Sequence, residues 1–168
     1  MDEIHLLDEK WQVSTESNTS SSSTVSVGEL LVTITSVEDF WGCYEAMGDF
    51  TEMKTGTDLY FLKGESKIAD NYRKIVFQFP TSNKEVFNNA WLNILLACLG
   101  ESMTYTEQIR GVLFSCRADY KVTIFLSRSC EEEVMKKLIE QIRSYNLLTN
   151  DVKIKYTNIN KGGFLDSK

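Results

Sequence analysis

The chain has 168 residues, 42% of them hydrophobic and 25% charged, a balance that suits one globular domain with a single core. Its net charge of -6 disfavours a protein that grips nucleic acid mainly through a broad basic surface, although it leaves room for a small basic pocket. No apolar run approaches the roughly 18 residues that span a bilayer, and the acidic start "MDEIHLLDEK" is unlike a signal peptide, so we expect an intracellular, cytoplasmic protein.

The N-terminal region combines an apolar segment with a low-complexity run. Residues 14–26, "STESNTSSSSTVS", carry small polar side chains that bury too little area to offset the entropy of ordering. This composition predicts a flexible loop or a frayed connection between strands, and the alternative is a disordered tail ahead of the domain. Trp11 and the preceding "IHLL" favour docking of the N-terminal segment.

Residues 37–47, "VEDFWGCYEAM", are predicted to form the first helix. Ser36 followed by Asp39 is a variant of the capping box, and acidic side chains in the first turn suit the helix dipole. An apolar stripe, wide for so short a helix, runs through Val37, Phe40, Trp41, Tyr44 and Met47. Periodicity alone favours burial of Trp41, and exposure to a partner is the alternative.

Two further helices are predicted from their caps and periodicity. Ser82, with Glu85 three residues on, opens "NKEVFNNAWLNILLACL", and Gly100 is the expected C-cap. Ser129, with Glu132 three residues on, opens "CEEEVMKKLIEQIRSY". One face of this third helix carries the apolar side chains of Val134, Leu138, Ile142 and Tyr145.

Six segments are rich in the residues that favour strands: "VSVGELLVTI", "TDLYFLK", "RKIVFQF", "IRGVLFSCR", "KVTIFLS" and "DVKIKYT". The pair "VLFSCR" and "KVTIFL", joined by "ADY", predicts an antiparallel hairpin. The order of strands and helices indicates an α+β fold, with a curved, mostly antiparallel sheet whose helices cover one face and leave the other partly open.

Catalytic and metal-binding patterns are missing from the sequence. The four cysteines have no CxxC pair, and His5, the single histidine, cannot complete a metal site. We expect reduced thiols, three of them buried. The chain also lacks a nucleophile with a partnered histidine, a glycine-rich phosphate loop and a recognisable carboxylate pair, so we expect neither an enzyme nor a bound cofactor.

Five separated segments carry a resemblance to a known family: "IHLLDEKW", "TSVEDFWGCYEAM", "GTDLYFLKG", "AWLNILLACLGE" and "IRGVLFSCRADYKVTIFL". In this order and spacing they resemble the eukaryotic translation initiation factor 4E family, whose members hold the methylated 5′ cap of messenger RNA. The resemblance implies that residues 1–168 are a single 4E-like domain. It also implies three long helices on the convex face of the sheet and a cap slot on the concave face.

The resemblance implies a partner-binding surface on the convex face. There the family binds initiation factor 4G and translational repressors through a helical motif of the partner. The matching positions in this chain are His5, Val37, Trp41, Leu92, Leu96 and Gly100. Two positions differ, because Leu6 replaces a proline and Asn93 replaces an acidic residue. The alternative interpretation places all these apolar side chains in the core.

The cap slot departs from the family pattern. The family stacks the cationic 7-methylguanine between two tryptophans, and each ring contributes about 1 to 3 kcal/mol. Here the first tryptophan position falls at or near Thr24, and the second falls in "KGESKIADNYRK", which contains no tryptophan. Asp70 and Tyr72 in that segment are candidate replacements for one half of the clamp, with an ordinary polar loop as the alternative.

The phosphate-binding end of the slot matches the family pattern better than the base-binding end does. Arg117 matches the arginine that contacts the cap triphosphate in the family, and Lys121 matches the lysine beyond it, whereas Asp119 replaces a second basic residue. The sequence therefore supports two functions. One is a divergent initiation factor that binds the cap through an altered pocket and recruits a 4G-type partner. The alternative is a 4E-like interaction protein that has lost cap binding and acts as a decoy, scaffold or regulator of translation.

Overall fold

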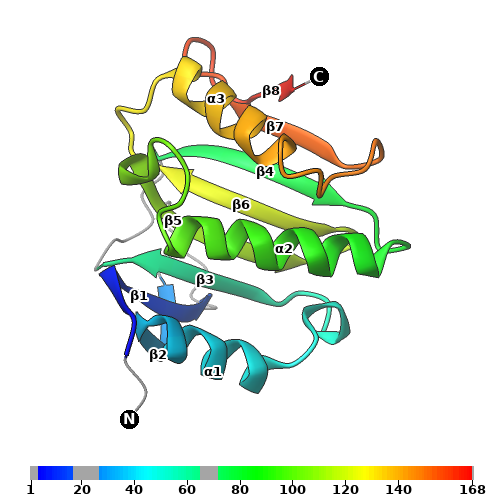
Figure 1. Ribbon diagram of the computed structural model, residues 1–168. Helices are drawn as coiled ribbons and strands as arrows, with labels where there is room; N and C mark the ends of the chain where they lie inside the picture. Colours follow the sequence, from blue (N-terminus) through cyan, green and yellow to red (C-terminus); the bar gives the residue numbers. More distant parts are fainter. Residues whose placement is uncertain (1–3, 17–26, 65–71, 168) are drawn as a thin grey trace.

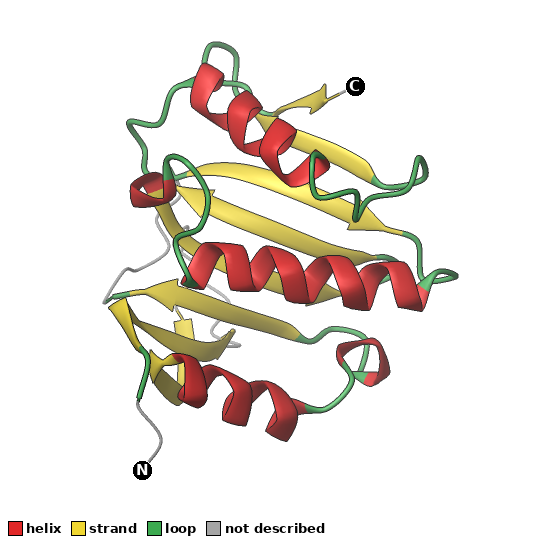
Figure 2. Ribbon diagram, viewed as in Figure 1, coloured by secondary structure: helices red, strands yellow, loops and turns green. Residues whose placement is uncertain are grey.

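The structure, a computed structural model, describes residues 4–16, 27–64 and 72–167. These residues form one eight-stranded antiparallel sheet, with strand order β2-β1-β3-β5-β6-β4-β7-β8, and three α-helices lie across one of its faces (Figures 1 and 2). The predicted α+β fold is therefore confirmed, including the placement of all three helices on a single face. None of the described helices combines the length and apolar character needed to cross a membrane.

The strands are β1 (Leu6–Glu16), β2 (Val27–Ser36), β3 (Asp58–Lys63), β4 (Arg73–Phe79), β5 (Ile109–Cys116), β6 (Tyr120–Leu126), β7 (Lys153–Thr157) and β8 (Phe164–Ser167). The helices are α1 (Val37–Met47), α2 (Lys84–Leu99) and α3 (Glu132–Arg143), with short 3-10 turns η1 (Phe50–Glu52) and η2 (Thr106–Gln108). The hairpin β5–β6 forms as predicted, with Cys116 opposite Tyr120.

The core lies between the helices and the sheet, with Trp91 of α2 at its centre. The Trp91 ring has its centroid 5.4 Å from that of Phe50 and 5.6 Å from that of Phe114, and all three side chains are almost fully buried. Successive strand residues point to opposite faces, so β5 sends Val112 and Phe114 into this core and Leu113 to the concave side. Packing under the helices thus sets which residues remain for the concave face.

The first two helices begin close to their predicted caps. Ser36 caps α1 as expected, because its Oγ accepts a hydrogen bond from the backbone N–H of Asp39 at 3.0 Å. The cap of α2 is Asn83, one residue later than the predicted Ser82, since the Asn83 side chain accepts from the N–H of Val86. Asparagine is as good an N-cap as serine, and propensity alone did not separate these neighbours.

The predicted cap of α3 was wrong. The helix begins after Glu131, whose side chain makes no capping bond, and Ser129 lies outside it. The Ser129 hydroxyl is 3.3 Å from that of Ser127 in the preceding turn, so it is not placed to cap the helix. Tyr145 lies beyond the end of α3 and is exposed, whereas Leu138 and Ile142 from the same apolar face are buried.

Two strands were not predicted from the sequence. Strand β1 pairs with both β2 and β3, and it includes residues 14–16, so the start of the serine-rich run belongs to the sheet. The rest of that run, residues 17–26, lies outside the described residues. The other addition is β8, a short edge strand that pairs only with β7. "FLDS" shows no strand alternation, and in "LLDEKWQVSTE" the alternation is confined to the five residues "KWQVS".

Substitution of Gly111 by alanine should destabilise the fold by about 1 to 3 kcal/mol through overpacking. An added Cβ would lie 2.8 Å from Leu62 Cδ2 and 3.0 Å from the Phe61 carbonyl oxygen. Gly42→Ala is the matched control, because nothing lies within 4 Å of its Cβ position inside α1, and it should stabilise by about 0.5 to 1 kcal/mol. Urea denaturation of both variants measures the difference, and a fully stable Gly111→Ala protein would contradict the β3–β5 packing.

Candidate functional site

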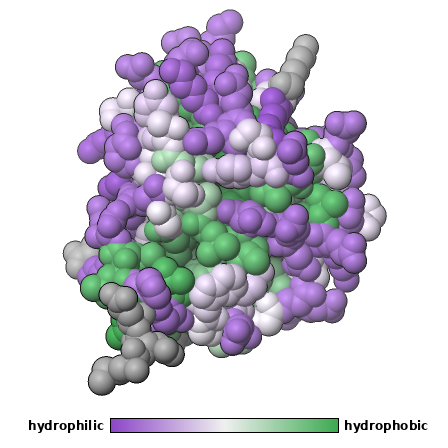
Figure 3. All heavy atoms as spheres, in the orientation of Figure 1, coloured by the Kyte–Doolittle hydropathy of each residue, from purple (hydrophilic) through white to green (hydrophobic). Residues whose placement is uncertain are grey.

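The convex patch consists of the six residues that the sequence predicts to bind a partner. Val37 and Trp41 lie on α1, Leu92 and Leu96 lie on α2, Gly100 is the C-cap of α2, and His5 precedes β1. Seen from the helix side, apolar side chains gather over the region between α1 and α2 (Figure 3). The fold thus brings three separate stretches of the sequence to one surface.

His5 is fixed to the start of α1. Its carbonyl oxygen accepts a hydrogen bond from the N–H of Val37 at 2.8 Å, and its Nδ1 lies 2.7 Å from a carboxylate oxygen of Glu38. The hydrogen bond from the His5 side chain holds the pKa of Glu38 below its usual value. The strap before β1 is therefore tied to the helix that carries Trp41.

The apolar stripe of α1 divides into a buried and an exposed half. Phe40 is 2% exposed and packs into the core, whereas Trp41 is 38% exposed and Val37 is 37% exposed. The Trp41 ring forms T-shaped pairs with Phe40 and Tyr44, with centroid distances of 5.2 and 6.0 Å. Trp41 is consequently held in place by its neighbours while it remains open to a partner.

The part of the convex patch on α2 is uncharged. Leu92 and Leu96 are partly buried against the core. Asn93, which stands between them, donates from its amide to the carbonyl oxygen of Asn89 at 2.7 Å. Gly100 ends the helix, and its N–H donates to the carbonyl oxygen of Leu96 at 2.9 Å. A partner would thus meet leucine side chains and a neutral amide on this helix.

On the concave side, Arg117 stands at the end of the β5–β6 hairpin. One guanidinium nitrogen lies 2.7 Å from Asp58 Oδ2, and another donates to the carbonyl oxygen of Cys116 at 3.0 Å. The Asp58 side chain is 7% exposed, but that of Arg117 is 43% exposed. The carboxylate therefore orients the guanidinium, which still faces solvent and can meet an anion.

Lys121 lies in a cavity of about 290 Å³ on the concave face, here called the lysine cavity. Its lining residues come from five strands: Lys74, Val76, Gln78, Leu113, Lys121, Thr123, Phe125, Lys155 and Phe164. Arg117 is not among them. Tyr72 packs beside the cavity, against a small cluster made by Tyr60, Leu62 and Phe125. Asp70 lies outside the described residues.

Sequence reasoning missed the aromatic and basic residues that surround Lys121. The rings of Tyr60 and Phe125 are stacked with centroids 6.4 Å apart, and Lys74 Nζ is 5.9 Å from the Phe125 centroid. Strand alternation held the signal, because Tyr60 in "TDLYFLK" and Phe125 in "KVTIFLS" stand at positions that face away from the helices.

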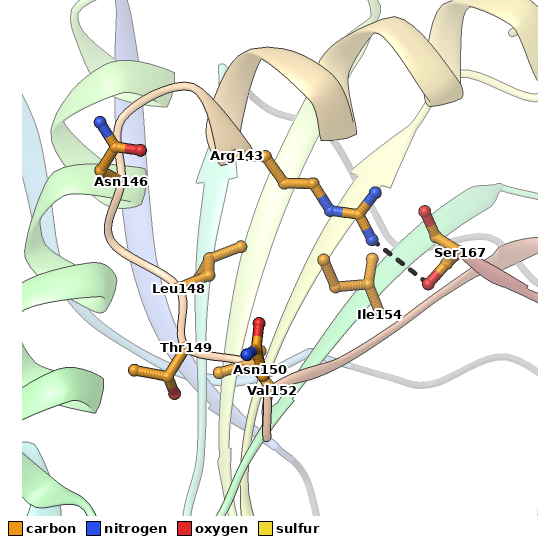
Figure 4. Close-up of a pocket in the computed structure, with 8 residues that line it drawn as sticks. All are labelled: Arg143, Asn146, Leu148, Thr149, Asn150, Val152, Ile154 and Ser167. Carbon is orange, nitrogen blue, oxygen red and sulfur yellow. Dashed lines mark hydrogen bonds between the residues drawn. The ribbon is translucent and has the colours of Figure 1, made fainter.

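A second cavity, of about 440 Å³, lies between the end of α3 and strands β7 and β8 (Figure 4). Arg143 donates across it to the carbonyl oxygen of Ser167 at 3.2 Å. None of the predicted site residues lines it, so we do not assign it to the candidate site.

The described residues hold no group of three or more histidine, cysteine or acidic side chains that could bind a metal. Three cysteines are buried as predicted, and Cys43 is partly buried. Burial raises the pKa of Cys98 to about 12 and that of Cys130 to about 11, so both thiols stay protonated near neutral pH.

Comparison with known proteins decides the family. The sequence model of "Eukaryotic initiation factor 4E" matches residues 6–164. The chain belongs to this family. It is 26% identical over 136 residues to eukaryotic translation initiation factor 4E of Candida albicans, a match that covers 75% of this chain and 65% of that protein. The chain spans between 60% and 65% of the length of the first curated 4E relatives that it matches.

Solved structures of 4E proteins share the fold. The complex of Ascaris suum eIF4E-3 with the m7G cap superposes with a TM-score of 0.79 at 19% identity, covering 98% of this chain and 96% of that one. The complex of C. elegans eIF4E-3 with the 4E-binding protein Mextli and a cap analog has a TM-score of 0.76 at 17% identity, covering 95% and 94%. These likenesses establish a shared architecture.

Replacement of Arg117 by alanine should cost about 1 to 3 kcal/mol of stability, because it leaves the buried Asp58 carboxylate without its cationic partner. Lys121→Ala is the matched control. It removes the same charge from the same hairpin, but Lys121 has no carboxylate within 4 Å among the described residues. Chemical denaturation should therefore separate the two variants, and equal stabilities would argue against the Asp58–Arg117 pair.

Proposed function

We propose that this 4E-family protein binds the 5′ cap of messenger RNA on its concave face and recruits a 4G-type partner through the convex patch, acting in the cytoplasm. The observation that carries the cap proposal is the gathering of basic and aromatic side chains on the concave side of a chain with net charge -6. The cap-bound 4E structures of the same fold support this direction. We propose a binding protein without catalytic activity.

The cap would be held in an altered way. Arg117 and Lys121 would contact its phosphates, because Arg117 is exposed and Lys121 lies in the lysine cavity. The methylated base would lie toward Tyr72, whose ring adjoins the Tyr60–Phe125 stack. One aromatic ring in place of two tryptophans gives less stacking and cation–π energy, so we expect weaker cap binding than a two-tryptophan clamp provides.

The partner would bind as an amphipathic helix. An exposed aromatic anchor with aliphatic neighbours is what groove recognition of such a helix requires, and Trp41 with Val37, Leu92 and Leu96 supplies this set. The complex of a 4E relative with the 4E-binding protein Mextli supports a partner of this type.

A second candidate function is a 4E-like interaction protein without cap binding. It is favoured by Asp58, which offsets the charge of Arg117 at 2.7 Å, and by the absence of both cap-stacking tryptophans from the sequence. Under this proposal only the convex patch would be used.

Titration with 7-methyl-GTP and with GTP separates the two functions. The cap proposal predicts tighter binding of the methylated nucleotide, because only its base is cationic and gains from an aromatic ring. Calorimetry is the suitable measurement. The three tryptophans Trp11, Trp41 and Trp91 lie on the helix side of the sheet, so their fluorescence would report poorly on the concave face.

Tyr72→Ala tests the location of the base within the same titration. Loss of the preference for 7-methyl-GTP would support Tyr72 as the stacking ring, and an unchanged affinity would remove it from the site. Equally weak binding of both nucleotides to the wild-type protein, even at millimolar concentration, would reject cap recognition and favour the interaction protein.

Trp41→Ala should weaken binding of a 4G-type helical peptide by at least about 2 kcal/mol while the protein stays folded, because the ring is an exposed anchor. Phe164→Ala is the control. It truncates an aromatic residue that is 50% exposed on β8, away from the convex patch, and should leave peptide affinity unchanged. A large drop in thermal stability for Trp41→Ala, with peptide affinity unchanged, would mean that Trp41 serves the core.

A further inference from the structure

The lysine cavity concentrates positive charge across three neighbouring strands. Lys121 lies on β6, Lys74 on β4 and Lys155 on β7. In the sheet register, Gln78 of β4 is opposite Lys121, and Val76 of β4 is opposite Lys155. The cationic positions thus extend over two strand spacings, about 10 Å. This span suits a chain of several anionic groups better than one carboxylate.

Within the described part of the chain, these lysines form no internal ion pair. Among the described residues, no carboxylate lies within 4 Å of the ammonium groups of Lys74, Lys121 or Lys155. Acidic residues lie at the border of this region. The Asp119 carboxylate accepts a hydrogen bond from Gln78, and Asp166 of the edge strand β8 is opposite Lys155. The cavity is therefore a local basic region, bordered by acidic residues, in a protein whose net charge is negative.

Aromatic side chains lie on both sides of this basic region. Lys74 already covers one face of the Phe125 ring, which leaves little of that ring for a ligand. Phe164, the first residue of β8, is 50% exposed at the other end of the cavity and is opposite Thr157 of β7. An exposed phenylalanine beside lysines offers a stacking surface next to anion-binding groups.

We propose that the lysine cavity and Phe164 bind a short single-stranded nucleotide chain, the segment of RNA that follows the cap. Lys121 and Lys155 contact successive phosphates, and one base stacks on Phe164. A nucleotide supplies both a phosphate and a flat aromatic group, whereas an acidic peptide would use the lysines and leave Phe164 without a role. The identity of this ligand as the RNA after the cap rests on the proposed cap function. Cap phosphates held at Lys121 would place the following nucleotides in the lysine cavity.

The test compares three probes by calorimetry or anisotropy: 7-methyl-GTP, a short capped oligouridylate, and the same oligonucleotide with a 5′ hydroxyl. We expect the capped oligonucleotide to bind more tightly than 7-methyl-GTP. Phe164→Ala should remove about fivefold or more of its affinity through lost stacking. Lys155→Ala should also reduce the slope of log affinity against log salt by about 0.7, the share of one phosphate contact on a single strand. Neither variant should alter 7-methyl-GTP binding.

Lys136→Ala is the control for charge, because it removes one lysine from the exposed face of α3 and should leave oligonucleotide affinity unchanged. Phe164→Tyr should restore the affinity that Phe164→Ala loses. Oligonucleotide affinity unchanged in both Lys155→Ala and Phe164→Ala would overturn the proposal, and so would an equal loss for 7-methyl-GTP. A different result would separate the two proposals. If 7-methyl-GTP does not bind but the uncapped oligonucleotide binds in a Lys155-dependent way, nucleotide binding in the lysine cavity is supported and the cap proposal is rejected. Binding of polyglutamate that competes with the oligonucleotide and ignores Phe164→Ala would also count against a nucleotide ligand.

Discussion

Along the central strands, side chains alternate between an aromatic core under the helices and an open concave face. Trp91, Phe87 and Phe114 fill the helix side and are fully buried, which fixes the register of the strands beneath them. A slip of one residue in a strand would turn its core side chains, such as Phe114 of β5, toward the concave face and place side chains from that face, such as Lys121 of β6, under the helices, at a cost the fold could not sustain. The concave surface is therefore determined by the core on the opposite side of the sheet.

The same core shapes the convex patch. Phe40 of α1 and Trp91 of α2 are committed to packing, while Trp41, one residue after Phe40, is left at the surface. An α-helix places consecutive residues about 100° apart, so a helix whose buried face is already filled must present its additional large side chain elsewhere. The apolar stripe on α1 is wide because one edge of the helix packs into the core while the other edge, which carries Trp41, is exposed at the surface.

Charge is distributed to match these two faces. The α2 part of the convex patch is neutral, and His5 is held by Glu38 at its border. The concave side combines Arg117, oriented by Asp58, with lysines from three strands. Local electrostatics of this kind acts over roughly a Debye length of 8 to 10 Å, so a protein with net charge -6 can still attract an anion to one cavity.

Much of the architecture could be predicted from the sequence. The bounds of α1, the hairpin β5–β6 and the α+β class depend on local periodicity and on residues within a few positions of one another. The family resemblance added the expectation that Trp41 lies at an edge of its helix. Local sequence signals did not predict the N-cap of α2, because the neighbours Ser82 and Asn83 are equally good capping residues. They also did not predict β8, because a strand of four residues is too short to show a periodic pattern.

The composition of the concave site was decided only by the tertiary structure. Lys74, Lys121, Lys155 and Phe164 are spread over 90 residues of sequence and meet only because β6, β4, β7 and β8 pair in that order. Likewise, Asp58 and Arg117 are 59 residues apart and become an ion pair through the β3–β5 pairing. The sequence alone determined which residue types each strand carries on each face. Non-local strand pairing, which depends on how the whole core packs, determined which of those residues became neighbours.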